Sequence, residues 1–402
     1  MIVRRPVAGA LALVVIGIGV AIGGAFSALS NSSAPRGASS PTLLASPTGG
    51  TPLSSGGPSP SPLAGTGPSA NPGPSPSPGP ILVAAPLDGL LVSPAAAARH
   101  PIACMIDDLS AARPQSGFSD ASVVWQAPAE GGIPRYMTVF QERVPKAVGP
   151  VRSARYYYIA WAAEWRAVYC HAGGSPQALE TLRAKGNGQL VFNADQFFND
   201  PYFWRISSRL PPHNLYTDGP HLEALARRVG GTAPPGKAVW RFAPDAPLAE
   251  RPNGGRIDVA YLANRITYRY DRATNTYRRY VSGGVRQVDA GTGKAVAPRN
   301  VVIMRMQFGP LNDGHPQKHR LEAKVVGSGI AWIATNGHTI RGTWRKRSLT
   351  APTLFYDAAG RPVTLTAGQT FVQVMKTTDF VSIKDGRVPP IPPTTQHGSI
   401  PE

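Results

Sequence analysis

The sequence has few cysteines and none of the short motifs that would identify a metal or hydrolase site. Only Cys104 and Cys170 occur among 402 residues, both in apolar segments, and the eight histidines are scattered. We therefore predict no metal site and no cofactor. No Gly-x-Ser-x-Gly motif is present, which argues against an α/β-hydrolase. A disulfide between the two cysteines is left open, because buried cysteine also packs as a small apolar residue.

Acidic residues are also scarce, especially in the second half of the chain. The sequence holds 41 basic and 23 acidic residues, for a net charge of +18. Residues 85–235 are nearly balanced, whereas residues 236–402 hold 24 basic and 11 acidic side chains, a net charge of +13. This surplus favours an anionic partner such as wall polymer or lipid headgroups, with solvated surface charge as the alternative. Nucleic acid is the least favoured partner, because the N-terminus indicates a location outside the cytoplasm.

That N-terminus contains a long run without charge. Val7–Leu29 comprises 23 apolar and small residues after Arg4-Arg5. This length spans a bilayer, and the arginines place the N-terminus in the cytoplasm. We predict a single-pass membrane anchor in residues 1–29 with the folded part outside. The alternative is a signal peptide cleaved near Ala25–Ala28, which would release a secreted protein.

A proline-rich segment separates this anchor from the folded part. Residues 30–80 contain 13 prolines and a single charge, Arg36, which is too much proline for regular structure. We predict a disordered linker over residues 30–84, followed by two domains at 85–235 and 236–395.

The first domain alternates predicted strands and helices. Strands are expected at 102–106, 121–126, 136–141 and 167–170, and helices at 149–166, 176–185 and 220–229. Ser175-Pro176 has the features of an N-cap and first helical position. This pattern predicts an α/β domain.

The second domain has the period of strands and almost no helical pattern. Turn signals such as Asn336-Gly337 separate the segments. We predict an antiparallel barrel or sandwich. Its expected strands are 257–261, 265–270, 277–281, 301–307, 320–326, 329–335, 338–344, 353–356 and 370–374.

Polar clusters follow the strands of the first domain, at the strand ends where open α/β sheets bind ligands. We predict that they line one cleft. Its candidate ligand-binding residues are Asp107, Arg113, Glu130, Arg135, Arg152, Arg155, His171, Ser175, His213 and Asn214.

Two arginines in this set have an unusual predicted position. Arg152 and Arg155 lie in the first turn of the expected 149–166 helix, where cations oppose the helix dipole. Either a ligand anion offsets them, or they form salt bridges with Asp107, Asp108 or Glu130.

His171 begins the stretch His171-Ala-Gly-Gly-Ser175 after an apolar strand. It could act as a general acid or base with Asp107 or Ser175, contact an anion, or only hold a neighbouring loop. The sequence leaves these three alternatives open.

The clusters together resemble a known family. The segments "MIDD…ARPQSG", "EGGIPR", "GPVRSAR", "HAGGS" and "PHNLY" occur in this order over about residues 85–385. They are similar to the YerB-like family of exported bacterial proteins, which is defined by a domain of unknown function (3048) and often classed as lipoproteins. The resemblance implies a location in the cell envelope and no established activity.

The chain departs from the family pattern in several places. No cysteine lies near the end of the apolar segment, so lipid anchoring is unavailable and Val7–Leu29 would have to serve instead. Gln126 stands where an acid is expected, which shows that an acid there is not essential. Pro134 replaces a usual threonine, and Asp108 a usual asparagine.

We therefore expect an extracytoplasmic envelope protein that binds an anionic envelope ligand in the cleft. The alternative is a hydrolase or transferase acting on wall glycan or peptide, with Asp107, Glu130 and His171 as acid/base candidates. Nucleic-acid binding through the basic second half is a weaker third hypothesis.

Overall fold

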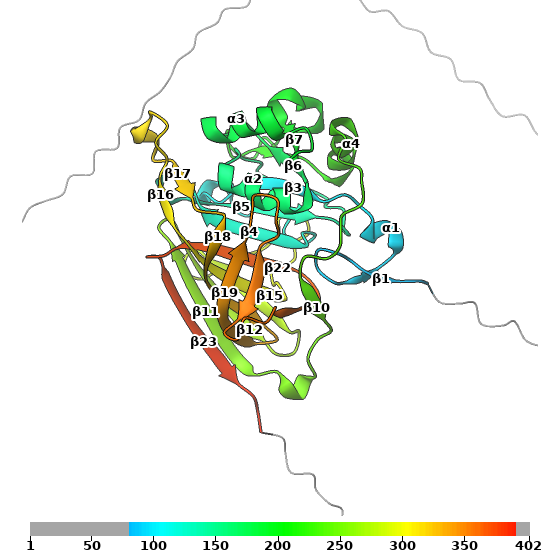
Figure 1. Ribbon diagram of the computed structural model, residues 1–402, viewed down its shortest axis with the longest axis vertical. Helices are drawn as coiled ribbons and strands as arrows, with labels where there is room; N and C mark the ends of the chain where they lie inside the picture. Colours follow the sequence, from blue (N-terminus) through cyan, green and yellow to red (C-terminus); the bar gives the residue numbers. More distant parts are fainter. Residues whose placement is uncertain (1–79, 391–402) are drawn as a thin grey trace, which may run out of the picture. The chain divides into compact units, whose positions relative to one another are not determined.

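The computed structural model describes residues 80–390 (Figure 1). The expected anchor and most of the expected linker lie outside the described residues. Within 80–390, no helix combines the length and apolar character needed to cross a bilayer. The described chain is mostly β-structure with four α-helices: α1 (Pro94–Ala97), α2 (Tyr156–Ala162), α3 (Pro176–Lys185) and α4 (Gly219–Val229).

A ten-stranded sheet runs through the molecule. Its strands come from both halves of the sequence. In spatial order they are β20 (Leu354–Asp357), β19 (His338–Lys346), β18 (Gly327–Thr335), β15 (Asn300–Met306), β22 (Thr370–Lys376), β4 (Val123–Pro128), β5 (Pro134–Phe140), β3 (Ile102–Asp107), β6 (Val168–His171) and β7 (Phe192–Asp195).

The join between the halves is made by β22, which pairs in parallel with β15 on one side and with β4 on the other. The sheet therefore continues across the boundary that the sequence suggests at residue 235. Through these pairings β3, β4, β6, β7, β15 and β22 all run in the same direction, so that their carboxyl ends lie at one edge of the sheet.

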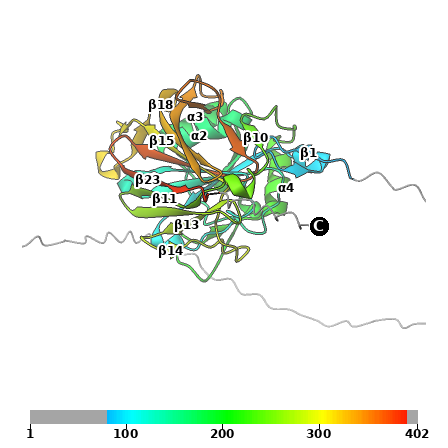
Figure 2. The ribbon, with the colours of Figure 1, turned by 90° about the horizontal axis from the view of Figure 1, so that it is seen from below.

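A second, five-stranded antiparallel sheet packs on the first. Its order is β14 (Val285–Arg286), β13 (Thr276–Val281), β12 (Asn264–Asp271), β11 (Asn253–Tyr261) and β23 (Phe380–Arg387). Figure 2 shows β11, β13 and β23 in one layer and β15 and β18 in the other. Both sheets keep open edges, so residues 80–390 form stacked sheets rather than the barrel alternative.

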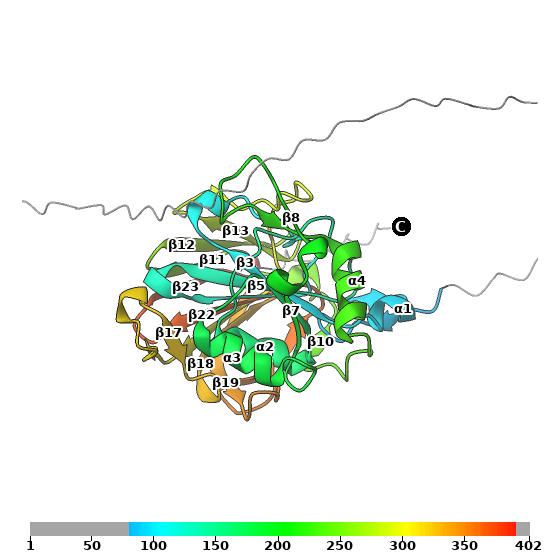
Figure 3. The ribbon, with the colours of Figure 1, turned by 90° about the horizontal axis from the view of Figure 1, so that it is seen from above.

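The long sheet is buried on both faces because its residues alternate between two apolar clusters. In β3, Ala103 and Met105 belong to the cluster under α2 and α3, whereas Cys104 and Ile106 belong to the cluster shared with the five-stranded sheet and α4. Figure 3 shows α2 and α3 on one side of β3 and β5, with β11 and β12 on the other.

Short strand pairs complete the fold. They are β1 (Val83–Ala84) with β2 (Leu91–Val92), β8 (Trp204–Arg205) with β9 (Leu215–Tyr216), β10 (Arg241–Ala243) with β21 (Thr364–Thr366), and β16 (Phe308–Pro310) with β17 (Leu321–Ala323). The paired structure thus begins at Val83, slightly before the expected start of the first domain.

The helices expected at 176–185 and 220–229 are present, but the one expected to begin at 149 is wrong at its start. Residues 148–151 form bridges with Thr217 and Ile106, and Arg152 N–H donates to the Met105 carbonyl at 3.0 Å. The segment is therefore extended, and α2 begins only at Tyr156. Arg152 and Arg155 do not lie in a first helical turn, and the dipole argument does not apply to them.

The two cysteines lie directly opposite each other. Cys104 of β3 pairs in register with Cys170 of β6. Both are buried free thiols, and burial raises the pKa of Cys104, helped by the neighbouring Cys170.

Candidate functional site

Three neighbouring parallel strands end in polar residues. Asp107, His171 and Asp195 are the last residues of β3, β6 and β7. By strand alternation all three face the side of the sheet that α2 and α3 cover, as does Arg135 of β5, which pairs in register with Asp107. The carboxyl ends of parallel strands are where α/β sheets commonly bind ligands.

A charged cavity of about 300 Å³ lies at this edge, and we call it the carboxyl-edge pocket. Its walls come from both halves of the chain. The short turn Glu130–Gly132 follows β4, and the β16–β17 hairpin, which follows β15, supplies two further cations. The charged lining residues are Asp107, Glu130, Arg135, Arg152, Lys318 and Arg320. Four cations thus face two carboxylates.

Ion pairs inside the pocket match the salt bridges that the sequence left as one alternative. Arg152 Nε lies 3.0 Å from Asp107 Oδ2, and Arg135 Nη2 lies 3.3 Å from Glu130 Oε2. Arg155 also pairs with Glu130. However, Arg152 Nε, Arg155 Nε and Glu130 Oε2 have no aligned hydrogen-bond partner among residues 80–390. The pairs are close in distance but leave buried polar atoms unsatisfied.

Burial disfavours the charged state of these arginines. It lowers the pKa of Arg155 to about 10 and also lowers the pKa of Arg135 and Arg152. For Arg152 and Arg135, the negative charge of Asp107 opposes this effect. An added anion would relieve the same desolvation cost.

His171 does not face the pocket as a free side chain. The ring is completely buried, its Nδ1–H donates to the Gly173 carbonyl at 2.8 Å, and its Nε2 hydrogen-bonds the Asn193 side chain at 2.8 Å. Of the three alternatives for His171, this geometry favours the one in which it holds a loop. The histidine that contacts Asp107 is His213, whose Nδ1–H donates to Asp107 Oδ2 at 2.6 Å.

Three other predicted residues have structural contacts instead. Arg113 turns to the opposite face of the sheet and donates to Asp108. Ser175 is buried at the start of α3, and its side chain does not cap the helix. Asn214 accepts from Arg205 at 2.8 Å and holds the β8–β9 hairpin.

A larger cavity of about 540 Å³ adjoins the carboxyl-edge pocket, and Arg152 lines both. We call it the aromatic cavity, because two exposed phenylalanines, Phe197 and Phe198, stand at its side. Gly173 and Gly174 of the "HAGGS" stretch form part of its wall. A side chain on Gly173 would meet the Phe197 ring at 3.1 Å, and its φ of +60° also favours glycine.

Sequence reasoning missed Lys318 and Arg320, and also Asn193, Asp195 and the two phenylalanines. The first pair reaches the site only because β15 runs parallel to β4 through β22, which local patterns do not reveal. Asn193 and Asp195 lie in β7, a four-residue strand with no apolar alternation, and the two phenylalanines follow it. One signal could have identified Asn193 and Asp195. These polar residues follow the turn at Gly188, and they resemble the polar residues at the other strand ends.

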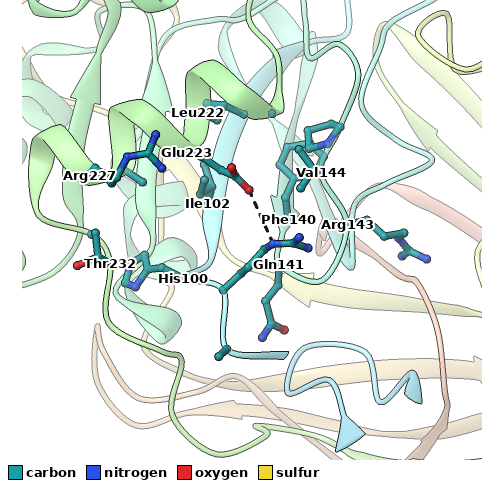
Figure 4. Close-up of a pocket in the computed structure, with 16 residues that line it drawn as sticks. His100, Ile102, Phe140, Gln141, Arg143, Val144, Leu222, Glu223, Arg227 and Thr232 are labelled. Carbon is teal, nitrogen blue, oxygen red and sulfur yellow. Dashed lines mark ion pairs between the residues drawn. The ribbon is translucent and has the colours of Figure 1, made fainter. Parts of the chain in front are cut away.

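A third cavity, of about 180 Å³, contains none of the predicted residues (Figure 4). It lies between α4 and the segments that flank β3 and β5, and Arg99 and Glu223, 3.7 Å apart, link its two sides. Within residues 80–390, no group of three or more histidine, cysteine or acidic side chains could hold a metal ion.

Two models of known protein families match this chain. The protein of unknown function (DUF3048) N-terminal domain matches residues 87–232, and the corresponding C-terminal domain matches residues 257–372. This chain belongs to the DUF3048 family. A relative from Bacillus subtilis (strain 168) is YerB, which is named as a candidate lipoprotein. The two sequences are 30% identical over 305 residues, which cover 75% of this chain and 89% of YerB.

A solved structure supports the same DUF3048 assignment. The crystal structure of YerB from Bacillus subtilis has a TM-score of 0.66 and 26% identity, covering 75% of this chain and 99% of that one. The resemblance read from the sequence motifs is confirmed.

Two departures from the DUF3048 pattern contact each other. Gln126 Nε2 donates to Asp108 Oδ2 at 2.7 Å. These are the two positions where the motif resemblance implies an acid and an asparagine, and the pair carries one carboxylate, on Asp108.

Proposed function

We propose that this protein is held at the outer face of the cell membrane and binds an anionic group of an envelope polymer or lipid in its carboxyl-edge pocket. The apolar segment Val7–Leu29 would be the anchor. The name of the relative YerB, a candidate lipoprotein, supports an envelope location. Because this chain has no cysteine before Cys104, the attachment would be through the protein segment rather than a lipid.

The observation that carries the binding proposal is the imbalance of charge in the pocket. Arg135 and Arg152 are desolvated, and Lys318 and Arg320 add two cations from the β16–β17 hairpin. Asp107 and Glu130 neutralise part of this charge, and Asp313 pairs with Arg320 from outside the pocket lining at 2.5 Å. Lys318 has no ion pair among residues 80–390. A phosphate or carboxylate accepts charge-assisted hydrogen bonds from several arginines at once, so it would complete the site.

The residual basic charge of residues 236–402 supports a second contact of the same kind. That surplus would hold the protein near an acidic polymer or lipid surface at low salt. Because β22 lies inside the shared sheet, this contact has to be measured on the whole chain rather than on a 236–402 fragment.

Calorimetric titration of the full-length protein with inorganic phosphate tests the pocket. We expect binding, and a loss of roughly tenfold or more in affinity for Arg152→Ala and for Lys318→Ala, since each removes a charged donor. Arg341→Ala is the matched control: it removes an exposed cation of β19 outside the pocket, and the affinity should change less than twofold. No phosphate binding, or an equal loss in all three variants, would show that the pocket is not an anion site.

The contact between Asp107 and His213 favours one second candidate, a hydrolase or transferase acting on the same ligand. A carboxylate that orients an imidazole is a common general-base arrangement. If isolated wall polymer is cleaved by the protein, His213→Asn should lower that rate by roughly 10²–10⁴. His171→Asn should have its main effect on folding stability, because His171 is buried and fully hydrogen-bonded.

A further inference from the structure

The aromatic cavity has features that the anion-binding proposal does not use. It is almost twice the size of the carboxyl-edge pocket, and the two share Arg152. Volumes of roughly 300–1,000 Å³ are typical of small-molecule sites. A ligand whose anionic group lies at Arg152 would therefore have a place for the chemical group attached to it.

One side of the cavity is apolar and exposed. The side chains of Phe197 and Phe198 are 70% and 77% exposed, although large apolar side chains usually avoid water. Their loop is fixed by Asp195, whose Oδ1 accepts from the N–H groups of Gly173 at 2.9 Å and Phe197 at 3.3 Å. The rings are thus held in position on a turn that the "HAGGS" glycines allow.

The floor of the cavity is polar and buried. Asp195 is 3% exposed and lines the cavity, yet its Oδ2 makes no hydrogen bond with any side chain or backbone group of residues 80–390. Asn193 lines it as well, and Arg183 and Arg205 contribute two cations. Oδ2 is open to the cavity, so a ligand with hydroxyl groups would be able to donate to it.

These observations argue against a purely apolar ligand, and against an inorganic anion alone, as the occupant of the aromatic cavity. A purely apolar ligand would cover Asp195 Oδ2 without donating to it, and an inorganic anion would leave both phenylalanine rings uncovered. A pyranose sugar has an apolar C–H face for an aromatic ring and a rim of hydroxyl groups for carboxylate, amide and guanidinium partners.

We propose that the two cavities together bind a glycosyl phosphate. The phosphate would lie among Arg135, Arg152 and Lys318, and the sugar would lie against Phe197 with its hydroxyl groups toward Asp195 and Asn193. This inference rests on the proposed anion-binding function and names the chemical class of the ligand.

Binding of inorganic phosphate, glucose and glucose 1-phosphate to the full-length protein tests the phosphate part and the sugar part of the proposal separately. Glucose 1-phosphate should bind roughly tenfold more tightly than inorganic phosphate, since a stacked ring and its hydroxyl contacts are added. Free glucose should bind more weakly than either anion.

Variants of the aromatic wall sharpen the test. Phe197→Ala should lower the affinity for glucose 1-phosphate to that for inorganic phosphate and leave the latter within twofold. Phe197→Leu, which keeps apolar volume without a flat ring, should lose part of the gain. Phe380→Ala is the matched control, because Phe380 is 59% exposed on β23 and lines neither cavity.

The two proposals fail in different ways. If inorganic phosphate and glucose 1-phosphate bind equally and Phe197→Ala changes neither, the glycosyl inference is wrong and the anion site stands. If adenosine monophosphate binds more tightly than glucose 1-phosphate, the cavity prefers a base to a sugar and the inference is again wrong. If none of the anions binds, the proposed function itself is wrong.

Discussion

Asp107 and Asp108 are consecutive residues with opposite surroundings. Asp107 faces the carboxyl-edge pocket and contacts Arg152 and His213. Asp108 faces the space between the two sheets, where Oδ1 accepts from Arg113 and Oδ2 accepts from Gln126 at 2.7 Å and Asn264 at 2.8 Å. We call the latter group, with Arg279, the inter-sheet network.

The two clusters differ in how completely their polar groups are satisfied. Arg279 is fully buried, and all three of its guanidinium nitrogens donate. Their partners lie on both sheets: Tyr268, Tyr136, Gln287 and Gln126. In the pocket, Arg152 instead leaves its buried Nε without an aligned acceptor, and Lys318 adds a cation that pairs with no carboxylate of residues 80–390.

The comparison shows why residue type alone does not identify a binding site. Both clusters are rich in arginine, aspartate and amides, and both follow strand ends in the sequence. A completely satisfied, dry network specifies how the sheets pack, whereas an open cluster with surplus charge retains capacity for a ligand.

The largest expected effect is on the inter-sheet network. Arg279→Met should lower the free energy of unfolding by about 3–5 kcal/mol, because it removes a buried charge partner of Asp108 and leaves several buried acceptors without donors. Denaturant unfolding of the full-length protein measures this, with Arg341→Met as an exposed control expected to change it by less than about 0.5 kcal/mol. A loss below about 1 kcal/mol for Arg279→Met would show that the network is not what joins the sheets.

A pH-dependent effect is expected from a third cluster, at the opposite end of β4 and β5. Asp88 and Glu142 are buried there and share Arg143, at 3.5 and 3.0 Å. Burial, reinforced by the charge of Glu142, raises the pKa of Asp88 from 3.8 to about 7. The folded state therefore binds a proton that the unfolded state releases between these values.

The protein should therefore become less stable as the pH rises. The contribution of Asp88 to stability is complete below about pH 4 and is lost as the pH rises toward 7, by up to about 4 kcal/mol. Unfolding titrations at several pH values should show this decline in the natural protein and a flatter profile in Asp88→Asn. Parallel profiles for the two proteins would mean that Asp88 is already ionised in the folded state at low pH.

The smallest expected change in stability is at the pocket. Arg152→Ala should cost about 1 kcal/mol or less, because its side chain is 24% exposed and Asp107 keeps its bonds to His213 and to the Leu109 N–H group. The same denaturant experiment compares it with Arg279→Met. A loss as large as that of Arg279→Met would make Arg152 a structural residue and remove the contrast between the clusters.

Local signals predicted the elements that depend on local structure. Ser175-Pro176 and Gly186 bound α3, and Gly230, in the left-handed region with φ +86°, ends α4. The predicted start of α2 was wrong because residues 148–151 pair with segments that are distant in sequence. For the same reason, no local pattern could show that β22 inserts between β15 and β4.

The candidate site was predictable only in part. Strand ends directed attention to Asp107, Glu130, Arg135 and Arg152, and these four residues line one pocket. Their role in binding stays a prediction. Arg113 was assigned to the same cleft because a sequence cluster does not show which face of the sheet each side chain takes. Lys318 depends on the direction of β15 in the sheet, which follows from tertiary pairing.

Crystallography can locate a bound anion in the carboxyl-edge pocket. Crystals of the protein soaked in arsenate, a phosphate analogue with an anomalous signal, would show where the anion lies. We expect an anomalous peak among Arg135, Arg152, Lys318 and Arg320, and no such peak in Arg152→Ala crystals soaked in the same way. An empty carboxyl-edge pocket, with arsenate bound only at exposed arginines such as Arg341, would contradict this expectation.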